Sequence, residues 1–402
     1  MATWKAREKY VIVGGGVAGA AAVEGIRERD TSGSIVLITS EGHLPYHRPP
    51  LSKKLWSGQK RVAEIFVNPR KFYDDHGVRV MQNCRITNVE TRHHIVVDDR
   101  RDAVRYDKLL LATGGAPRRL QIPGAQLEGI NYFRTLDDYW RLRQEAAEGR
   151  SAVVVGGGYI GTEIAAALHN AGVLVTMVYP ASYLCRRVFP ESLGRAVQEV
   201  YRQKGVAVMA SDQPIGFSRD GGKFRTRTAN AKIVESDLLI VGAGIRPEVA
   251  LAGGADLAVN NGVVVNDLLQ TSDPDIYAAG DNACFPYAAL GRWTRIEHWD
   301  NALNQGKCAG RNMAGAREAY SYMPYFFSDL FDLGYEAVGD VTPDLEMHAD
   351  WEEENRKGVV YYLKEGRVRG ALMCNVWDRV ATAREMILRG ETPAAHDLLR
   401  AA

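Results

Sequence analysis

Two short stretches carry glycines at the same spacing, a pattern that can bind phosphate groups. The glycines lie at Gly14, Gly16 and Gly19 in VIVGGGVAGAAA and at Gly156, Gly158 and Gly161 in VVVGGGYIGTEIA. Glycines at this spacing let a turn close, let the backbone approach a pyrophosphate and let a helix pack against a strand. The N-terminus of the following helix offers unpaired N–H groups to the phosphates. Each stretch therefore predicts a dinucleotide-binding loop.

Each loop also has the flanking elements that this chemistry needs. YVIV precedes the first loop and AAAVEGIRE follows it, while SAVVV and TEIAAALHNAG flank the second. Apolar runs of this length predict buried strands, and strand, tight turn and helix is the required order. Two complete units imply two adenine dinucleotides, although an inactive duplicate, or a glycine turn that binds no nucleotide, has the same pattern.

Two further strands end in glycine turns, one before and one after the second unit. YDKLLLATGGAPRRL breaks at Thr113 and Gly114, and TSDPDIYAAGDNA ends at Gly280 and Asp281. Alone, each is an ordinary strand and turn. Together, and in this order, they resemble the two-dinucleotide-binding flavoprotein disulfide reductase superfamily. The resemblance implies that these segments complete an FAD-binding domain and that the inserted unit binds NADH or NADPH.

The fold class that follows is α/β, with two Rossmann-like domains and a small α+β C-terminal domain. The resemblance implies a discontinuous FAD-binding domain (1–118 and 246–324), an inserted NAD(P)H-binding domain (119–245) and a C-terminal domain (325–402).

The string LPYHRPPLSKK presents basic side chains from a stiff loop, because Pro49 and Pro50 restrict the backbone. Alone, this pattern is also typical of a solvated turn. The string resembles the R-P-P-L-S-K segment of the ferredoxin, putidaredoxin and rubredoxin reductases and of apoptosis-inducing factor. In these relatives the Arg contacts FAD, and the Lys lies beside the isoalloxazine, paired with a Glu. The resemblance implies these roles for Arg48, Lys53 and Glu163.

The Lys53–Glu163 pair is the predicted catalytic pair, holding Lys53 near the flavin. A carboxylate at Glu163 would also be stabilised by the helix N-terminus alone, by about 0.3 to 1 kcal/mol. A pair removed from water interacts more strongly, although desolvation offsets much of the gain.

The resemblance covers nearly the whole chain and implies further cofactor contacts. Arg118 matches a residue that reaches the FAD pyrophosphate, and Phe327 stands where relatives commonly have a Trp against the flavin. Tyr159 either covers the nicotinamide pocket or serves packing. The other candidate cofactor-binding residues are Val17, Ala18, Ile86, Ala112, Ile160, Gly242, Ala243, Gly244, Glu297, His298 and Trp299.

The two units differ where their second strands end. SIVLITSE ends at Glu41, placed to accept hydrogen bonds from a ribose 2′-hydroxyl, whereas VLVTMVY ends at Tyr179. An acid at the second site would repel the 2′-phosphate of NADPH. None follows before Glu191, and Arg186 and Arg187 lie between. We therefore expect relaxed specificity, although Arg187 matches a basic position that NADH-using relatives also have.

Composition and charge exclude several classes of function. The 402 residues are 46% apolar and 25% charged, which is typical of a soluble globular protein, and the net charge of +1 gives no case for nucleic acid. Residues 326–402 are acidic, with 9 Lys and Arg against 15 Asp and Glu. With no secretory leader and no run of 18 apolar residues, we expect a cytoplasmic protein that does not enter a membrane.

The five cysteines are scattered, without the spacing of a zinc site or a redox dithiol, and none precedes Cys84. The sequence therefore predicts no metal, and electrons must leave the flavin for an external acceptor.

Three outlets for these electrons remain open. A ferredoxin or rubredoxin is the acceptor that the R-P-P-L-S-K branch most often serves. The second possibility is an NADH-responsive flavoprotein like apoptosis-inducing factor, which forms a charge-transfer complex and signals through oligomerisation or a partner. The stretches ATGGAPR and GYEAVGDV favour this possibility, whereas the short DWEEENRKG segment does not. The third is reduction of a quinone or monodehydroascorbate. A homodimer is compatible with each outlet.

Overall fold

The computed structural model describes residues 3–393, which form two compact units. The first comprises Met1–His47, Val62–Ala116 and Arg246–Pro324, and the second comprises Arg48–Arg61, Pro117–Ile245 and Tyr325–Ala402. Each unit is therefore assembled from segments that are far apart in the sequence. The three-domain division given above stays a prediction.

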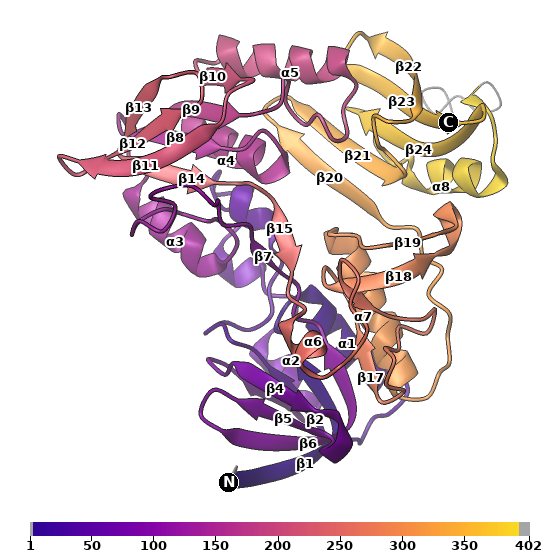
Figure 1. Cartoon of the computed structure of the whole chain (residues 1–402). Coiled ribbons are helices and arrows are strands. Elements are labelled where there is room, and N and C mark those ends of the chain that lie inside the picture. The colour runs from indigo at the N-terminus through magenta and orange to yellow at the C-terminus, as the bar shows by residue number, and fades with distance from the viewer. Residues whose placement is uncertain (1–2, 394–402) are drawn as a thin grey trace. The chain divides into compact units, whose positions relative to one another are not determined.

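The first unit is built on a seven-stranded sheet of order β3-β2-β1-β6-β5-β4, with β17 also paired to β6 (Figure 1). Its strands are β1 (Thr3–Val13), β2 (Ile35–Ile38), β3 (Val78–Met81), β4 (Ile86–Glu90), β5 (Ile95–Asp98), β6 (Asp102–Leu111) and β17 (Ile276–Ala278). The strands β1, β2, β3, β6 and β17 pair in parallel, whereas β5 runs against both of its neighbours. All four residues of β2 are buried, as expected where a parallel sheet is covered on both faces.

Helices α1 (Val17–Arg27) and α7 (Trp299–Met313) pack unusually closely in this unit. A Cβ on Gly306 would lie 2.2 Å from the carbonyl oxygen of Ala18, and one on Gly310 would lie 2.2 Å from that of Ala22. The helix after the first glycine loop is thereby fixed against a helix from far downstream. The remaining elements are η2 (Val62–Glu64), α2 (Arg70–Asp75), η3 (Thr91–His93), α6 (Ala250–Gly254), β16 (Val263–Val264), β18 (Ala283–Tyr287), η4 (Ala288–Leu290) and β19 (Arg292–Thr294).

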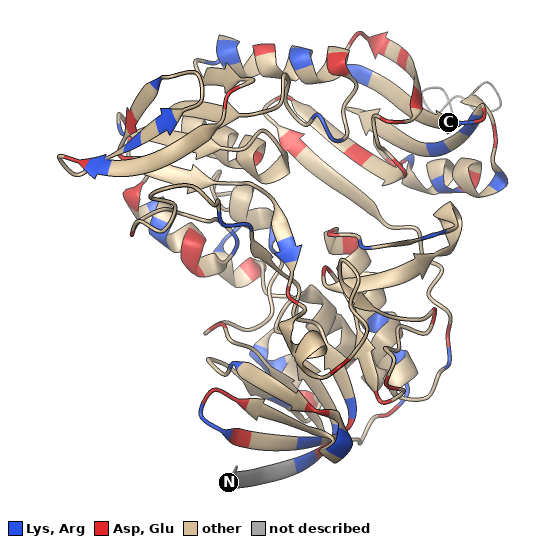
Figure 2. Cartoon of the chain, in the orientation of Figure 1, with Lys and Arg blue, Asp and Glu red and all other residues tan. Residues whose placement is uncertain are grey.

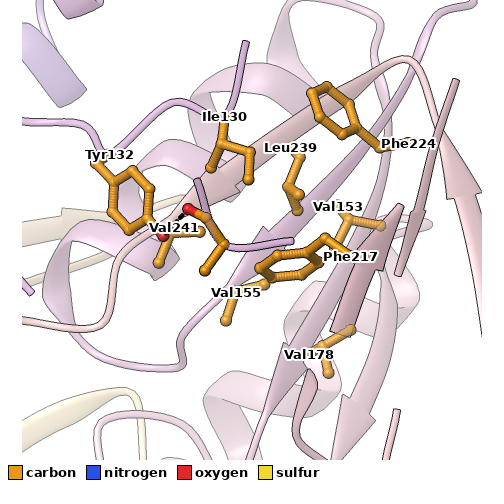
Figure 3. Packing of buried hydrophobic residues seen from close by; sticks show 10 residues of the cluster. Ile130, Tyr132, Val153, Val155, Val178, Phe217, Phe224, Leu239 and Val241 are labelled. Carbon is orange, nitrogen blue, oxygen red and sulfur yellow. Dashed lines mark hydrogen bonds between the residues drawn. The ribbon is translucent and has the colours of Figure 1, made fainter. Parts of the chain in front are cut away.

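The second unit contains a parallel sheet of order β10-β9-β8-β14 and an antiparallel sheet of order β11-β12-β13. Their strands are β8 (Ser151–Val155), β9 (Leu174–Tyr179), β10 (Ala207–Ala210), β11 (Pro214–Asp220), β12 (Lys223–Thr228), β13 (Ile233–Ser236) and β14 (Leu238–Val241). Figure 3 shows the apolar cluster in which Phe217 and Phe224 lie with Val153, Val155 and Leu239. This core supports the strand that leads into the second glycine loop.

A five-stranded antiparallel sheet of order β20-β21-β24-β23-β22 completes the second unit. Its strands are β20 (Tyr325–Leu330), β21 (Leu333–Gly339), β22 (Glu346–Glu353), β23 (Lys357–Lys364) and β24 (Arg367–Cys374). The helices of this unit are η1 (Pro49–Ser52), α3 (Leu136–Glu145), α4 (Tyr159–Asn170), α5 (Glu191–Gln203) and α8 (Val380–Arg389). A unit boundary falls within each of β7 (Gly115–Pro117) and β15 (Ile245–Pro247). The predicted α/β class with two Rossmann-like units is confirmed.

Candidate active site

The first glycine loop contains two glycines that the fold itself requires and one that faces open space. Gly14 has a φ of +129°, and a Cβ there would lie 2.0 Å from the carbonyl oxygen of Ala112. A Cβ on Gly19 would lie 2.1 Å from the carbonyl oxygen of Gly14, whereas one on Gly16, just before α1, meets no atom within 4 Å. The loop therefore closes tightly and leaves room at the helix N-terminus for the pyrophosphate of FAD, so these residues fit that cofactor.

The second glycine loop repeats this arrangement. Gly156 has a φ of +120°, and a Cβ there would lie 2.3 Å from the carbonyl oxygen of Gly242. A Cβ on Gly161 would lie 2.1 Å from the carbonyl oxygen of Gly156, and one on Gly158, just before α4, again meets no atom within 4 Å. Both loops thus have the shape that a dinucleotide needs.

The two returning segments lie against the first loop. Ala112 faces Gly14, and a Cβ on Gly280 would lie 3.1 Å from the side chain of Ala18. The Thr113 hydroxyl donates to the carbonyl oxygen of Glu248 at 2.6 Å. These residues from distant parts of the sequence are therefore brought together in the first unit.

The predicted ribose acid of the first unit is held by an aromatic neighbour. The Tyr46 hydroxyl donates to Glu41 Oε2 at 2.6 Å. Because Tyr46 fixes one oxygen of this carboxylate, Glu41 is oriented from within its own unit. The sequence did not identify Tyr46, although it lies inside the quoted LPYHRPPLSKK string.

The start of α7 is a partly buried polar region. Burial lowers the pKa of His298 to about 4, so its imidazole is neutral near pH 7. The Trp299 indole Nε1 donates to His47 Nδ1 at 2.8 Å. Arg295 pairs with Glu297 at 2.6 Å and also donates to the carbonyl oxygen of Asp281 at 2.9 Å. Glu297 and Trp299, two of the three predicted flavin neighbours at this helix start, are thus held by partners of their own unit.

Three other candidate residues make contacts within their own units. Ile86 is the first residue of β4, opposite Asp98 of β5. Arg118 donates from Nε to the carbonyl oxygen of Ile245 at 3.0 Å, and Arg48 donates from its guanidinium to that of Arg134 at 2.8 Å. Neither contact tests the predicted roles of these arginines toward FAD, which stay predictions.

The predicted Lys53–Glu163 pair is present in the second unit, with 3.1 Å between Lys53 Nζ and Glu163 Oε1. Both side chains are buried, at 9% and 6% exposed. The Ser52 hydroxyl donates to Oε2 and the Ser328 hydroxyl to Oε1, each at 2.5 Å. The sequence did not identify either serine, because nothing in its spacing places β20 beside the start of α4.

One aromatic ring lies against this pair. Lys53 Nζ lies 4.6 Å from the centre of the Phe327 ring and donates to the carbonyl oxygen of the same residue at 3.3 Å. The rings of Tyr159 and Phe326 meet edge to face at 5.2 Å. Ile160, beside Tyr159, is an exposed apolar residue at 40%. The start of α4 therefore carries one aromatic side chain, Tyr159, that packs against another, and one exposed apolar side chain, Ile160.

Tyr179, the last residue of β9, is less exposed than a residue that lines an open ribose site would be. This residue is 1% exposed, and its hydroxyl is hydrogen-bonded to the Gln198 side chain at 2.5 Å. Its ring packs under Gly157, where an added Cβ would lie 2.7 Å from Cγ of that ring. Arg186 and Arg187, by contrast, are exposed. The arginines are therefore better placed than Tyr179 to meet a ligand arriving from solvent.

All five cysteines are buried and unpaired in disulfides. Burial raises the pKa of every thiol, to about 11 for Cys84 and about 12 for Cys185, Cys308 and Cys374, and Cys284 is raised as well. A thiol of this kind supplies almost no thiolate near pH 7 and is a poor nucleophile. No group of His, Cys, Asp and Glu within residues 3–393 could hold a metal ion, and none of the helices there is long and apolar enough to cross a membrane.

These loops and sheets define a class of proteins that bind two dinucleotides. The model of the pyridine nucleotide-disulphide oxidoreductase family matches residues 8–306, and the chain belongs to this family. A second model, for the C-terminal region of mitochondrion-associated apoptosis-inducing factor, matches residues 341–389. The protein is therefore an FAD-dependent oxidoreductase that uses NAD(P)H, which confirms the predicted cofactors.

Similar proteins are found over nearly the whole chain. The ferredoxin–NAD(+) reductase component of an anthranilate 1,2-dioxygenase system from Burkholderia cepacia is 32% identical, with 97% of each chain covered. Apoptosis-inducing factor 1 from Dictyostelium discoideum is 31% identical over 96% of this chain and 79% of that protein. A putidaredoxin reductase solved in covalent complex with putidaredoxin is 30% identical with a TM-score of 0.90, covering 96% of this chain and 94% of that one. The predicted branch of the superfamily is confirmed.

Proposed function

We propose that this enzyme takes hydride from NAD(P)H and passes electrons to a ferredoxin or rubredoxin. The observation that carries the proposal is the state of the five thiols, which are buried with raised pKa values. A thiol is already reduced, and none of the five cysteines is paired in a disulfide that could take up electrons from the flavin, so the electrons leave the chain. The names of the reductase relatives support an iron–sulfur carrier as the acceptor.

FAD, when bound, supplies the ring system that takes up two electrons. The residues of this chain bind the two dinucleotides and orient them. The first glycine loop holds one pyrophosphate at the N-terminus of α1, and the second holds another at the N-terminus of α4. Lys53, fixed by Glu163, supplies a buried positive charge and N–H donors where the nicotinamide is to be held.

An NADH-responsive flavoprotein is a second candidate, because residues 341–389 match the C-terminal region of apoptosis-inducing factor. The acidic character of residues 326–402 bears on the choice between this candidate and a reductase of a ferredoxin or rubredoxin. Asp and Glu residues mark β22 in Figure 2, and residues 326–402 carry 15 acidic against 9 basic side chains. An acidic carrier would be repelled there and would have to dock elsewhere on the protein.

We expect the reduced protein to be reoxidised rapidly by a ferredoxin. Anaerobic titration with NADH, followed by mixing with ferredoxin or air in a stopped-flow spectrometer, measures this directly. A long-lived absorption band at long wavelength that resists oxidation, together with a mass change on size exclusion, would instead favour the NADH-responsive protein. The same chromatography tests the proposed homodimer, and cell fractionation tests the proposed cytoplasmic location.

Activity with NADPH is expected to be measurable beside activity with NADH. We propose that Arg186 and Arg187, both exposed, contact the 2′-phosphate, since charge-assisted hydrogen bonds to phosphate are strong. Replacing both with Ala should lower kcat/KM for NADPH about ten-fold, roughly 1.4 kcal/mol, and leave NADH nearly unchanged. Arg195→Ala is a matched control, because Arg195 is an exposed arginine on α5 paired with Glu191. Equal losses with both nucleotides would contradict this assignment.

A further inference from the structure

The Glu163 carboxylate receives three donors, which come from separate parts of the chain. Oε1 accepts from the Ser328 hydroxyl at 2.5 Å and lies 3.1 Å from Lys53 Nζ, while Oε2 accepts from the Ser52 hydroxyl at 2.5 Å. Glu163 lies in the first turns of α4, Ser52 ends η1 and Ser328 lies in β20. Three elements of the second unit therefore meet on one side chain.

All of these groups are removed from solvent. Ser52 is 3% exposed and Ser328 1% exposed. A buried carboxylate is costly unless hydrogen bonds satisfy it. Because a serine occupies each oxygen, the carboxylate is fixed in its plane as well as in its position. A single ammonium partner would leave it free to rotate.

We propose that Ser52 and Ser328 are positioning residues that hold the Glu163 carboxylate and, through it, the ammonium of Lys53. The ammonium has only one other polar contact among the described residues, the carbonyl oxygen of Phe327 at 3.3 Å. The position of the ammonium therefore depends on the Glu163 carboxylate, and the orientation of that carboxylate depends on the two serine hydroxyls. The inference rests on the proposed role of Lys53 in hydride transfer.

Rates of flavin reduction by NADH test the proposal in Ser52→Ala, Ser328→Ala and the double variant. We expect a loss of about three-fold to ten-fold in each single variant and a larger loss in the double variant, with FAD content and NADH affinity unchanged. Ser328→Thr keeps the hydroxyl and places a β-branched residue in a strand, so it should restore most of the rate. Ser236→Ala is the control: Ser236 is 1% exposed, and its hydroxyl has no hydrogen-bond partner among the described residues.

A second measurement does not depend on turnover. Brief acylation of the FAD-bound protein with an amine-reactive ester, read by peptide mass spectrometry, compares Lys53 with its exposed neighbour Lys54. Modification of Lys53 relative to Lys54 should rise several-fold in the double variant, because the ammonium is no longer held. Unchanged rates of reduction together with unchanged acylation would overturn the proposal. If Lys53→Ala itself leaves reduction unaffected, the role of Lys53 fails instead.

Discussion

Replacing Lys53 with Ala should slow the reduction of bound FAD by NADH about 100-fold while FAD stays bound. A preorganised donor in a site that excludes water typically contributes a factor of 10² to 10³. Lys53 is such a group, since its side chain is 9% exposed and lies 3.1 Å from Glu163. Stopped-flow absorbance of the flavin under anaerobic conditions measures the rate directly.

Glu163→Ala should also slow reduction, for a different reason. The buried ammonium of Lys53 would lose its carboxylate partner, and breaking one member of a buried pair leaves a charge poorly compensated. Lys54→Ala is the matched control, because Lys54 is the adjacent lysine and is exposed. If FAD were reduced at the wild-type rate in both Lys53→Ala and Glu163→Ala, the pair would have a purely structural role.

Replacing Gly16 with Ala should weaken FAD binding about 100-fold, roughly 2.8 kcal/mol, in a chain that still folds. The wild-type protein should be yellow, with one FAD per chain. A Cβ on Gly16 meets no protein atom within 4 Å, so the added methyl group enters only the space that the pyrophosphate needs. Flavin absorbance of the purified variant and titration of its FAD-free form measure the loss.

Gly158→Ala provides the matched comparison, since Gly158 occupies the same place in the second loop and also has no atom within 4 Å. It should keep FAD and lose affinity for NAD(P)H. Gly253→Ala, another glycine with open space around it but in α6, should affect neither ligand. If Gly16→Ala binds FAD as tightly as the wild type, the first loop does not hold the pyrophosphate.

The candidate site was only partly visible from sequence. The Lys53–Glu163 pair was predicted, but only because a family resemblance supplied both partners; no spacing rule joins residues 110 positions apart. Ser328 is 165 positions from Glu163, and Trp299 is 252 positions from His47. Contacts over such separations follow from how sheets and helices pack, so neither Ser328 nor His47 could be assigned. The burial of Tyr179 likewise depends on its packing under Gly157 and on Gln198 of α5.

The sequence by itself determined the two phosphate-binding loops, because the chemistry of each depends on glycines within six residues and on the strand and helix at either side. It also determined the absence of paired cysteine motifs and hence the need for an external electron acceptor. Tertiary structure alone decided which donors surround Glu163, since η1, α4 and β20 meet only after folding. It also decided that every thiol is buried with a raised pKa, because burial belongs to the packed core and not to the cysteine itself.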